Sequence, residues 1–296
     1  MAGIDPFGSL STDAVAPGTI RRAARRFLAE DVGAGDVTTR CVVPPGLRGQ
    51  CAIIARESCV LAGLDVALAV FEVLDPDLRV EPKMRDGDRV PAAGVVAMIS
   101  GRTSPMLTGE RVALNVLQHL SAIATLTRRY VDAVAGTGAS ISDTRKTTPG
   151  LRLFDKRAVR AGGGRNHRYG LFDAVLIKDN HVAAAGGVRE ALAAVRRAAV
   201  TVPVQIEVDS LEQLSEALDC GIDAVLLDNM PPDTVAVAVD LVRGHRGGRQ
   251  CWIEASGGIT LGNVRLYAET GVDTISIGAL THSAPSVDLA LDLVTL

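Results

Sequence analysis

The chain has 296 residues, of which 47% are hydrophobic and 22% are charged, and its formal net charge is −3. These values are typical of a globular protein that can bury a large core, either as two domains or as one large barrel. Aromatic residues make up only 3% of the chain. A low aromatic content and a slightly negative charge argue against a nucleic-acid-binding protein.

The sequence contains no apolar run of about 18 residues that would predict a membrane span. Its first residues lack the basic-then-apolar order of a secretory signal, so we expect a cytoplasmic protein. The five cysteines form no CxxC pair, and their number is odd. This pattern favours neither a disulfide framework nor a zinc site.

The N-terminal third predicts a short arm followed by mixed helices and strands. Residues 1–18 are rich in Pro and small residues and predict a mobile arm. Residues 19–32 predict an amphipathic helix with Thr19 as a candidate N-cap. Residues 49–61 predict strands, residues 63–74 a helix, and residues 78–102 short strands separated by Gly and Pro.

Residues 107–135 have a helical pattern that is too long for one helix of average length, so we predict two helices with a break near Ser121. Arg111 would then lie in a first helical turn, where a cation opposes the helix dipole. Anion binding would explain this position, and a tolerated surface arginine would explain it equally well.

From Gly136 onward, apolar strands alternate with helices. Strands are predicted at residues 174–177, 204–206, 224–227, 251–253 and 274–277, with helical patterns between them. Such alternation indicates a parallel sheet covered by helices, in which functional side chains lie at the carboxyl ends of the strands. Lys178, Glu207 and Asp228 directly follow three of these strands, and Ser256 follows a fourth. A single charged residue at such a position can be a solvated strand end, but four in register favour a site.

Glycine-rich loops follow the last two predicted strands. SGGIT comes after Glu254, and ISIGALTHS ends the chain's strand-and-helix repeat. Backbone amides in such loops bind phosphate, although a tight turn that requires glycine is the alternative explanation. We therefore predict a phosphate site at Ser256, Gly257, Gly258 and Gly278. Glu207 and Asp228 would suit ribose hydroxyls or Mg2+.

Positive charge is concentrated between Asp143 and His181, a segment with nine Lys or Arg and four Asp. Guanidinium and ammonium groups interleaved with Gly162–Gly164 predict a pocket for a compact polyanion, and a solvated surface loop is the competing interpretation. The chain contains no Walker lysine motif, HExxH, GxSxG or GxGxxG. Neither a nucleophilic serine nor a metal hydrolase is indicated.

Nine sequence segments, in order, resemble the quinolinate phosphoribosyltransferase family (nicotinate-nucleotide pyrophosphorylase, decarboxylating). They are EDVGAGDVTT, LTGERVALNVLQHLSAIAT, DTRKTTPG, AVRAGGGRNHRYGL, LIKDNH, QIEVDS, LLDNM, EASGGI and ISIGALTHS. The resemblance spans nearly the whole chain after the arm. It implies an α/β protein with an N-terminal α/β sandwich at residues 19–118, joined by residues 283–296, and an open, incomplete α/β barrel at residues 119–282.

The resemblance also implies a reaction and a set of roles. Phosphoribosyl pyrophosphate and quinolinate would give nicotinate mononucleotide, pyrophosphate and CO2, with Mg2+ as cofactor, in a homodimer. Quinolinate would be bound by Arg111 of the partner subunit together with Arg145, Lys146, His167, Arg168 and Lys178. Phosphoribosyl pyrophosphate would be bound by Lys146, Lys178, Glu207, Asp228, Ser256, Gly257, Gly258, Gly278 and His282. Lys146, Lys178, Glu207 and Asp228 would be catalytic, and Glu207 and Asp228 would hold the metal directly or through water.

Three alternatives stay open. Relatives associated with molybdenum transport typically lack an intact KDNH segment, which is present here as Lys178 to His181. A nicotinate-specific phosphoribosyltransferase would need fewer carboxylate-binding cations than this chain offers. A non-catalytic phosphate-binding barrel would have no need of Glu207 and Asp228 beside those cations. One departure from the family pattern is Arg157 in DKRAVR, where relatives often have an aromatic residue.

Overall fold

The computed structural model describes residues 15–246 and 251–295, which form two units. The antiparallel unit comprises residues 15–128, 148–163 and 283–295, and the parallel unit comprises residues 129–147 and 164–282. Residues 119–128 and 148–163 thus group with the N-terminal part of the chain. The predicted domain boundaries stay a prediction. Residues 1–14 of the predicted arm lie outside the described residues, and α1 already begins at Pro17.

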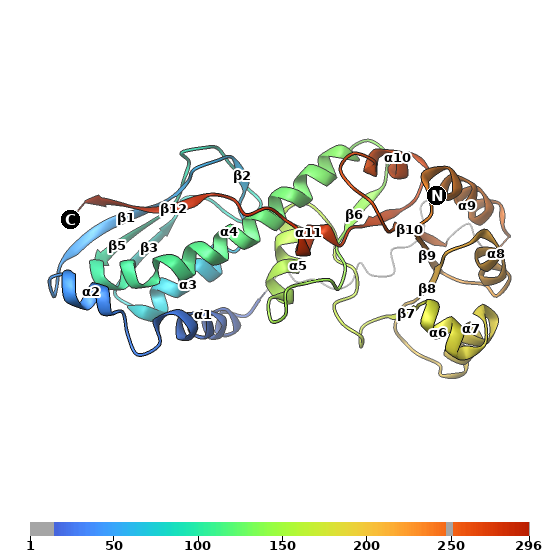
Figure 1. Ribbon diagram of the computed structural model, residues 1–296, viewed down its shortest axis with the longest axis horizontal. Coiled ribbons are helices and arrows are strands. Elements are labelled where there is room, and N and C mark those ends of the chain that lie inside the picture. The colour runs from blue at the N-terminus through green and yellow to red at the C-terminus, as the bar shows by residue number, and fades with distance from the viewer. Residues whose placement is uncertain (1–14, 247–250, 296) are drawn as a thin grey trace. The chain divides into compact units, whose positions relative to one another are not determined.

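The antiparallel unit is built on a four-stranded sheet with the order β12-β1-β5-β3 (Figure 1). A two-stranded sheet of β2 and β4 accompanies it. Its strands are β1 (Arg48–Ala55), β2 (Cys59–Val60), β3 (Arg79–Pro82), β4 (Arg89–Val90), β5 (Val95–Arg102) and β12 (Leu289–Thr295). Its helices are α1 (Pro17–Val32), α2 (Val37–Val42), α3 (Leu64–Leu74), most of α4 (Thr103–Ala133) and α5 (Arg152–Ala161). The chain returns at its end to add β12 beside β1.

The core of this unit follows from the apolar patterns. Helix α1 buries Ala24 and Leu28, and α3 buries nearly every residue of its first two turns. The helix predicted at residues 19–32 is thereby confirmed, but its cap is not Thr19. The N-cap is Ala16, and Pro17 opens the helix, a position that suits proline because no intrahelical N–H is needed there.

Helix α4 is one continuous helix of 31 residues, so the predicted break near Ser121 is wrong. Ser121 is fully buried, and its hydroxyl accepts a hydrogen bond from the backbone N–H of Ala62 at 3.1 Å. The polar residue that suggested a break instead ties the helix to the segment after β2. Because α4 begins at Thr103, Arg111 lies beyond the first turn. Its charge therefore does not oppose the helix dipole, contrary to the prediction.

The parallel unit contains a six-stranded sheet with the order β6-β11-β10-β9-β8-β7, in which every neighbouring pair is parallel. The strands are β6 (Ser140–Ser142), β7 (Val175–Ile177), β8 (Val204–Val208), β9 (Ala224–Asp228), β10 (Trp252–Ser256) and β11 (Thr274–Ser276). Its helices are α6 (Asp179–Ala185), α7 (Val188–Arg197), α8 (Leu211–Asp219), α9 (Pro232–Gly244), α10 (Val264–Glu269) and α11 (Ala279–His282). The sheet has β6 and β7 as edges and does not close, which confirms the predicted fold class of α/β sandwich plus incomplete barrel.

Three local features of the fold differ from the sequence prediction or were missing from it. Helices α6 and α7 are separate because Gly186 and Gly187 both adopt positive φ between them. Strand β6 and helix α5 were not predicted.

Among the described residues, no helix combines the length and the apolarity needed to cross a bilayer.

Candidate active site

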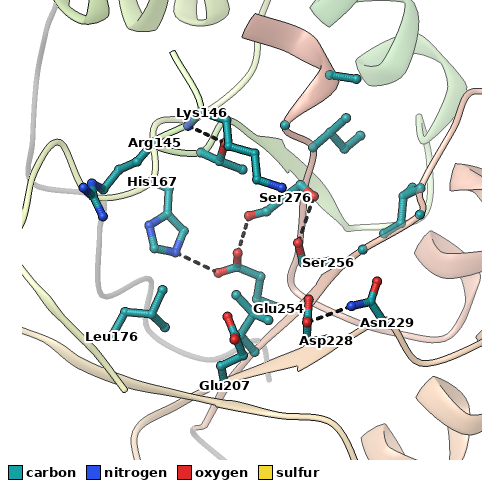
Figure 2. Close-up of a pocket in the computed structure, with 18 of the residues that line it drawn as sticks. Arg145, Lys146, His167, Leu176, Glu207, Asp228, Asn229, Glu254, Ser256 and Ser276 are labelled. Atoms are coloured by element: carbon teal, nitrogen blue, oxygen red, sulfur yellow. Dashed lines mark hydrogen bonds and ion pairs between the residues drawn. The ribbon is translucent and has the colours of Figure 1, made fainter. Parts of the chain in front are cut away.

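A cavity of about 720 Å3 lies in the parallel unit, where the chain leaves the carboxyl ends of the strands (Figure 2). Twelve of the thirteen site residues predicted from the sequence line it. They are Arg145, Lys146, His167, Arg168, Lys178, Glu207, Asp228, Ser256, Gly257, Gly258, Gly278 and His282. Residues between 145 and 282 in the sequence thus meet in one place.

The sheet register explains why these side chains converge. Asp228 is paired with Ser256, and Leu226 is the partner of both Glu207 and Glu254. Alternate residues of a strand point to the same face, so β9 presents Leu226 and Asp228 to the cavity, β10 presents Glu254 and Ser256, and β8 presents Glu207. The side chains that line the cavity thus come from neighbouring positions on one face of the sheet.

Positive charge reaches the cavity from Arg145 and Lys146, which follow β6, from Arg168, and from Lys178, which follows β7. The Arg168 side chain is only 6% exposed, and its Nη1 donates to the carbonyl oxygen of Ala174 at 3.1 Å. Burial, followed by the positive charge of Arg145, lowers the pKa of Arg168. Facing cations that are partly desolvated create a site for an anion, because the anion would relieve their mutual repulsion.

Two carboxylates occupy neighbouring strand ends on the same cavity. Glu207 forms an ion pair with the ammonium group of Lys178. Asp228 accepts a hydrogen bond from the side-chain amide of Asn229 at 2.8 Å. Burial raises the pKa of Asp228, and the charges of Lys178 and Lys146 only partly offset that effect. These carboxylates can accept hydrogen bonds from hydroxyl groups or stabilise a developing positive charge.

The loops after β10 and β11 both need glycine, but for different reasons. Gly257 and Gly258 have φ values of 94° and 63°, which side chains rarely adopt. A Cβ atom at Gly278 would also lie 2.9 Å from Cδ of Lys146 and 3.1 Å from Nε2 of His282. The absence of these side chains leaves the loop backbone open to the cavity, as phosphate-binding loops require.

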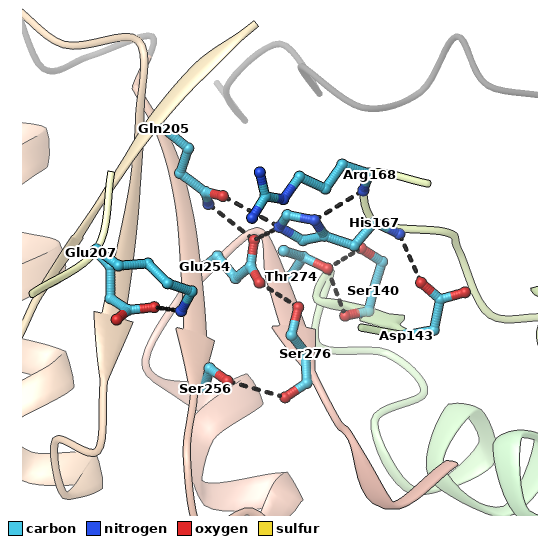
Figure 3. A network of polar contacts seen from close by, with 11 residues as sticks. Ser140, Asp143, His167, Arg168, Gln205, Glu207, Glu254, Ser256, Thr274 and Ser276 are labelled. Atoms are coloured by element: carbon cyan, nitrogen blue, oxygen red, sulfur yellow. Dashed lines mark hydrogen bonds and ion pairs between the residues drawn. The ribbon is translucent and has the colours of Figure 1, made fainter. Parts of the chain in front are cut away.

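His167 belongs to a buried polar cluster at the wall of the cavity, whose other members, Gln205, Glu254 and Ser276, were missed by the sequence interpretation (Figure 3). Glu254 is fully buried, and its carboxylate accepts hydrogen bonds from Gln205 at 2.8 Å and from Ser276. Nε2 of His167 lies 3.3 Å from the same carboxylate. Burial alone would raise the pKa of Glu254, but the contact with His167 and the hydrogen bonds of Gln205 and Ser276 lower it overall. The available signal was polar residues that alternate within apolar strands, at 205 and 207 and at 254 and 256.

The segment that carries His167 and Arg168 is fixed to the end of β6. The buried carboxylate of Asp143 accepts hydrogen bonds from the His167 backbone N–H at 2.9 Å and from the Asn166 side chain at 2.6 Å. The Arg165 backbone N–H donates to the carbonyl oxygen of Ile141 at 2.7 Å. Asp143 is thus the structural anchor of the cationic side of the cavity.

Several basic residues of the segment from 143 to 181 do not line the cavity. Arg157 forms an ion pair with Asp65 at 2.8 Å within the antiparallel unit, which gives this departure from the family pattern a structural role. Lys156 is fully buried, and Arg165 lies over the ring of Trp252 at 5.7 Å. Arg111, the thirteenth predicted residue, is exposed on α4 in the antiparallel unit. The polyanion site therefore uses only part of the positive charge of this segment.

No group of three or more His, Cys, Asp or Glu among the described residues is arranged to hold a metal ion. Glu207 and Asp228 nevertheless offer two carboxylates to one cavity. Two protein carboxylates completed by substrate oxygens are a common way of binding Mg2+. The donor set fits a metal that arrives with a phosphorylated substrate.

Comparison with known proteins agrees with this geometry. The family models of the N-terminal and C-terminal domains of quinolinate phosphoribosyl transferase match residues 36–121 and 123–292. A nicotinate-nucleotide pyrophosphorylase (carboxylating) from Mycobacterium leprae is 48% identical, with 92% of this chain and 96% of the relative covered. A probable enzyme of the same name from Bacillus subtilis is 41% identical, with 93% of each chain covered.

A solved structure supports the same relationship. The nicotinate-nucleotide pyrophosphorylase from Francisella tularensis superposes with a TM-score of 0.91 at 36% identity, covering 97% of this chain and all of the other. The likeness covers both units and not the cavity alone. The chain belongs to the quinolinate phosphoribosyl transferase family.

Proposed function

We propose that the protein transfers the phosphoribosyl group of phosphoribosyl pyrophosphate to quinolinate and releases pyrophosphate and CO2, forming nicotinate mononucleotide for NAD biosynthesis. One observation carries this proposal. A single cavity combines four cations, two strand-end carboxylates and two glycine loops, and so offers complementary groups to each part of both substrates. Membership of the family supports the same reaction.

The acceptor subsite is assigned to the cationic side of the cavity. Quinolinate carries two carboxylates on adjacent ring carbons, and Arg145 and Arg168 can each bind a carboxylate through a planar fork of N–H donors. His167 forms part of the same wall. Lys146 and Lys178 line the same cavity and would bind both the acceptor and the departing pyrophosphate. A substrate with one carboxylate would use fewer of these cations.

The donor subsite is assigned to the carboxylates and loops. Glu207 and Asp228 would accept hydrogen bonds from the ribose hydroxyls, and the backbone from Ser256 to Gly258, together with Gly278 and His282, would bind the 5'-phosphate. As the bond from the anomeric carbon to pyrophosphate lengthens, positive charge develops on the ribose ring. The two carboxylates face that charge and would stabilise it electrostatically.

Bond formation requires the acceptor nitrogen to approach the anomeric carbon from the side opposite the leaving group. Fixed cations on one wall and carboxylates on the other can hold the two anionic substrates in this orientation, which lowers the entropic part of the barrier. Mg2+, when bound with pyrophosphate oxygens near Glu207 and Asp228, would supply charge neutralisation of the leaving group. Lys146 and Lys178 would supply further positive charge there.

Decarboxylation would follow on the bound intermediate. Once the ring nitrogen carries ribose it is positively charged, and the carboxylate on the adjacent carbon leaves as CO2 with its bonding electron pair remaining on that carbon. The adjacent cationic nitrogen stabilises the pair until a proton from water replaces the lost group. No side chain of the protein has to act as an electron sink. The protein contributes position and charge.

We further propose that the enzyme acts as a homodimer in which Arg111 of one subunit reaches the cavity of the other. The exposure of Arg111 and its position outside the lining of its own cavity support this idea. The cytoplasmic location expected from the sequence also stays a prediction. Neither nucleic acid nor membrane is expected as a partner.

The reaction is tested by incubating the full-length protein with quinolinate labelled in the carboxylate next to the ring nitrogen, phosphoribosyl pyrophosphate and Mg2+. Labelled CO2 and nicotinate mononucleotide should appear in equal amounts. A parallel incubation with nicotinate should give little product. Product formed only from nicotinate would favour the nicotinate-specific alternative, whereas binding of both ligands without pyrophosphate release would indicate a non-catalytic protein.

A further inference from the structure

The imidazole of His167 is held from both of its nitrogens by other parts of the same unit, and its backbone is held as well (Figure 3). The ring is 7% exposed and belongs to the wall of the cavity. Its protonation state therefore decides what this wall presents to an anionic acceptor. The contacts of the two nitrogens identify that state.

Nδ1 must carry a lone pair. The backbone nitrogen of Arg168 donates its hydrogen to Nδ1 of His167 over 2.8 Å. A backbone N–H can only donate, so a hydrogen on Nδ1 would face another hydrogen at this distance. An imidazolium would lose this bond and leave the Arg168 N–H without its acceptor.

Nε2 must carry the hydrogen. It lies 3.1 Å from Oε1 of Gln205 and 3.3 Å from Oε2 of Glu254. The amide orientation of Gln205 follows from its other contact, because Nε2 of Gln205 donates to Oε2 of Glu254 at 2.8 Å. The reverse orientation would place an amide oxygen against the carboxylate. The Gln205 oxygen and the Glu254 carboxylate thus both point toward Nε2 of His167. The contacts of Nε2 and of Nδ1 therefore indicate the same tautomer, with the hydrogen on Nε2.

The carboxylate of Glu254 is the origin of this arrangement. It is fully buried and accepts hydrogen bonds from Gln205, Ser276 and the imidazole, which are the donors that a buried carboxylate needs. Through Gln205 it also fixes which end of the amide faces the ring. The ring fixed in this way accepts, at Nδ1, a hydrogen bond from the backbone N–H of Arg168. The guanidinium of Arg168 in turn donates to the carbonyl oxygen of Ala174.

We propose that Glu254 and Gln205 are positioning residues that hold His167 as the neutral imidazole with hydrogen on Nε2, and that His167 in turn fixes Arg168 for binding an acceptor carboxylate. This inference rests on the proposed function for the identity of the acceptor, although the protonation state does not depend on it. His167 then contributes an uncharged ring to the wall of the acceptor subsite and holds the backbone of Arg168 in place. The positive charge comes from the arginines and lysines.

The first test measures the protonation state without any turnover. Full-length protein labelled with 15N at histidine is studied at neutral pH by long-range 1H–15N correlation, and the His167 signals are assigned by their loss in His167→Gln. The expected pattern is an unprotonated Nδ1 and a protonated Nε2. A doubly protonated ring, or hydrogen on Nδ1, would overturn the proposal even if the enzyme were fully active.

The second test separates positioning from a general loss of structure. Glu254→Gln keeps an oxygen that can accept from Nε2 and should keep the tautomer, whereas Glu254→Leu removes the acceptor and should give a mixture of ring states. In Glu254→Leu the KM for quinolinate should rise about tenfold, the size expected for one hydrogen bond to a charged group, with little change in the KM for phosphoribosyl pyrophosphate. Glu212→Leu, on the exposed face of α8, is the matched control and should change neither value.

If Glu254→Leu does not fold, Gln205→Met carries the same test, because it removes the amide that orients the ring. An unchanged His167 tautomer in both Glu254→Leu and Gln205→Met would overturn the positioning role. Equal rises in both KM values would overturn it as well. If quinolinate is not a substrate, the KM comparison fails while the tautomer measurement still stands, so failure of the proposed function can be told apart from failure of this inference.

Discussion

A Cβ atom built on Gly257 would lie 2.6 Å from Cγ and 2.8 Å from the backbone nitrogen of Asn229. That nitrogen donates to the carbonyl oxygen of Ser256 at 2.9 Å, and Asn229 itself has a φ of 54°. The loops after β9 and β10 are thus fitted to each other with no space for a side chain. Asn229 directly follows Asp228, and its side-chain amide donates a hydrogen bond to the Asp228 carboxylate.

Gly257→Ala should raise the KM for phosphoribosyl pyrophosphate about tenfold, because the added methyl group both meets Asn229 and disfavours the positive φ. Steady-state kinetics with each substrate varied in turn measures this change. The matched control is Gly244→Ala at the end of α9, where a Cβ meets nothing within 4 Å. Normal kinetics in Gly257→Ala would show that this loop does not hold the 5'-phosphate.

Glu207→Gln should lower kcat on the order of a hundredfold, because it removes a negative charge that faces the ribose when positive charge develops there. The KM for quinolinate should change much less. Glu216→Gln is the control, since Glu216 lies outside the cavity and its carboxylate contacts Arg189 through a 3.9 Å ion pair and a 3.3 Å hydrogen bond from the Arg189 backbone N–H, a bond that the Gln oxygen can still accept. A normal kcat in Glu207→Gln would count against the electrostatic role.

Arg145→Ala should raise the KM for quinolinate about tenfold or more, since one charge-assisted contact to a carboxylate is lost. The KM for phosphoribosyl pyrophosphate should rise less. Arg160→Ala, an exposed arginine outside the cavity, serves as the control. Equal rises for both substrates would contradict the assignment of Arg145 to the acceptor subsite.

Arg111→Ala and Glu207→Ala should each be inactive alone and should regain activity when their subunits are exchanged. In a symmetric dimer with sites completed in trans, half of the mixed dimers are hybrids and each hybrid has one intact site, so about a quarter of the wild-type activity should return. Subunit exchange is monitored with differently tagged chains. Exchange without recovery would argue that Arg111 acts elsewhere.

Asp75→Asn should lower the Tm by a few degrees at neutral pH, with a smaller difference in acid. The hydrogen bond from Arg102, at 2.8 Å, lowers the pKa of Asp75 despite the opposing effect of burial. A folded-state pKa below the unfolded value means that the stabilisation is complete above the ordinary pKa near 3.8 and is lost as the pH falls through the lowered value.

Thermal unfolding followed by circular dichroism from about pH 7 down to about pH 2 would show the difference between wild type and Asp75→Asn shrinking below about pH 4. Asp288→Asn, an exposed aspartate of the same unit, is the control. A difference that stays constant over this range would mean that Asp75 stabilises the unit through packing and not through its charge.

The parallel sheet could be predicted because its strands contain short apolar runs with a polar residue at or near the carboxyl end. β9 ends at Asp228, β10 ends at Ser256, and Glu207 is the penultimate residue of β8. Their carboxyl ends meet because parallel strands share one direction. β6 could not be found in this way, since Ser140–Ser142 is short and polar and is defined by its pairing with β11, which is distant in sequence. Ser121 misled the prediction for α4 because its buried partner, Ala62, is distant in sequence.

The same limit applies to the site. Residues at strand ends, such as Lys178 and Asp228, could be identified from position alone. Glu254 and Gln205 were not identified, because the alternation of polar residues within an apolar strand does not show what each one contacts until its partners are known. Those partners come from other strands and from the segment fixed by Asp143. The charged groups exposed to the cavity were therefore predictable, and the buried groups that orient them were not.

The pairing of β12 with β1 sets an order on the assembly of the newly made chain. One edge of β1 stays unpaired until residues 289–295 have been synthesised, after the entire parallel sheet. An exposed strand edge with the apolar residues Ile53 and Ile54 is prone to pair with other chains during that interval. The seven residues of β12 thus cover the exposed edge of β1. A chain whose synthesis stops before them would have an antiparallel sheet that is prone to aggregation.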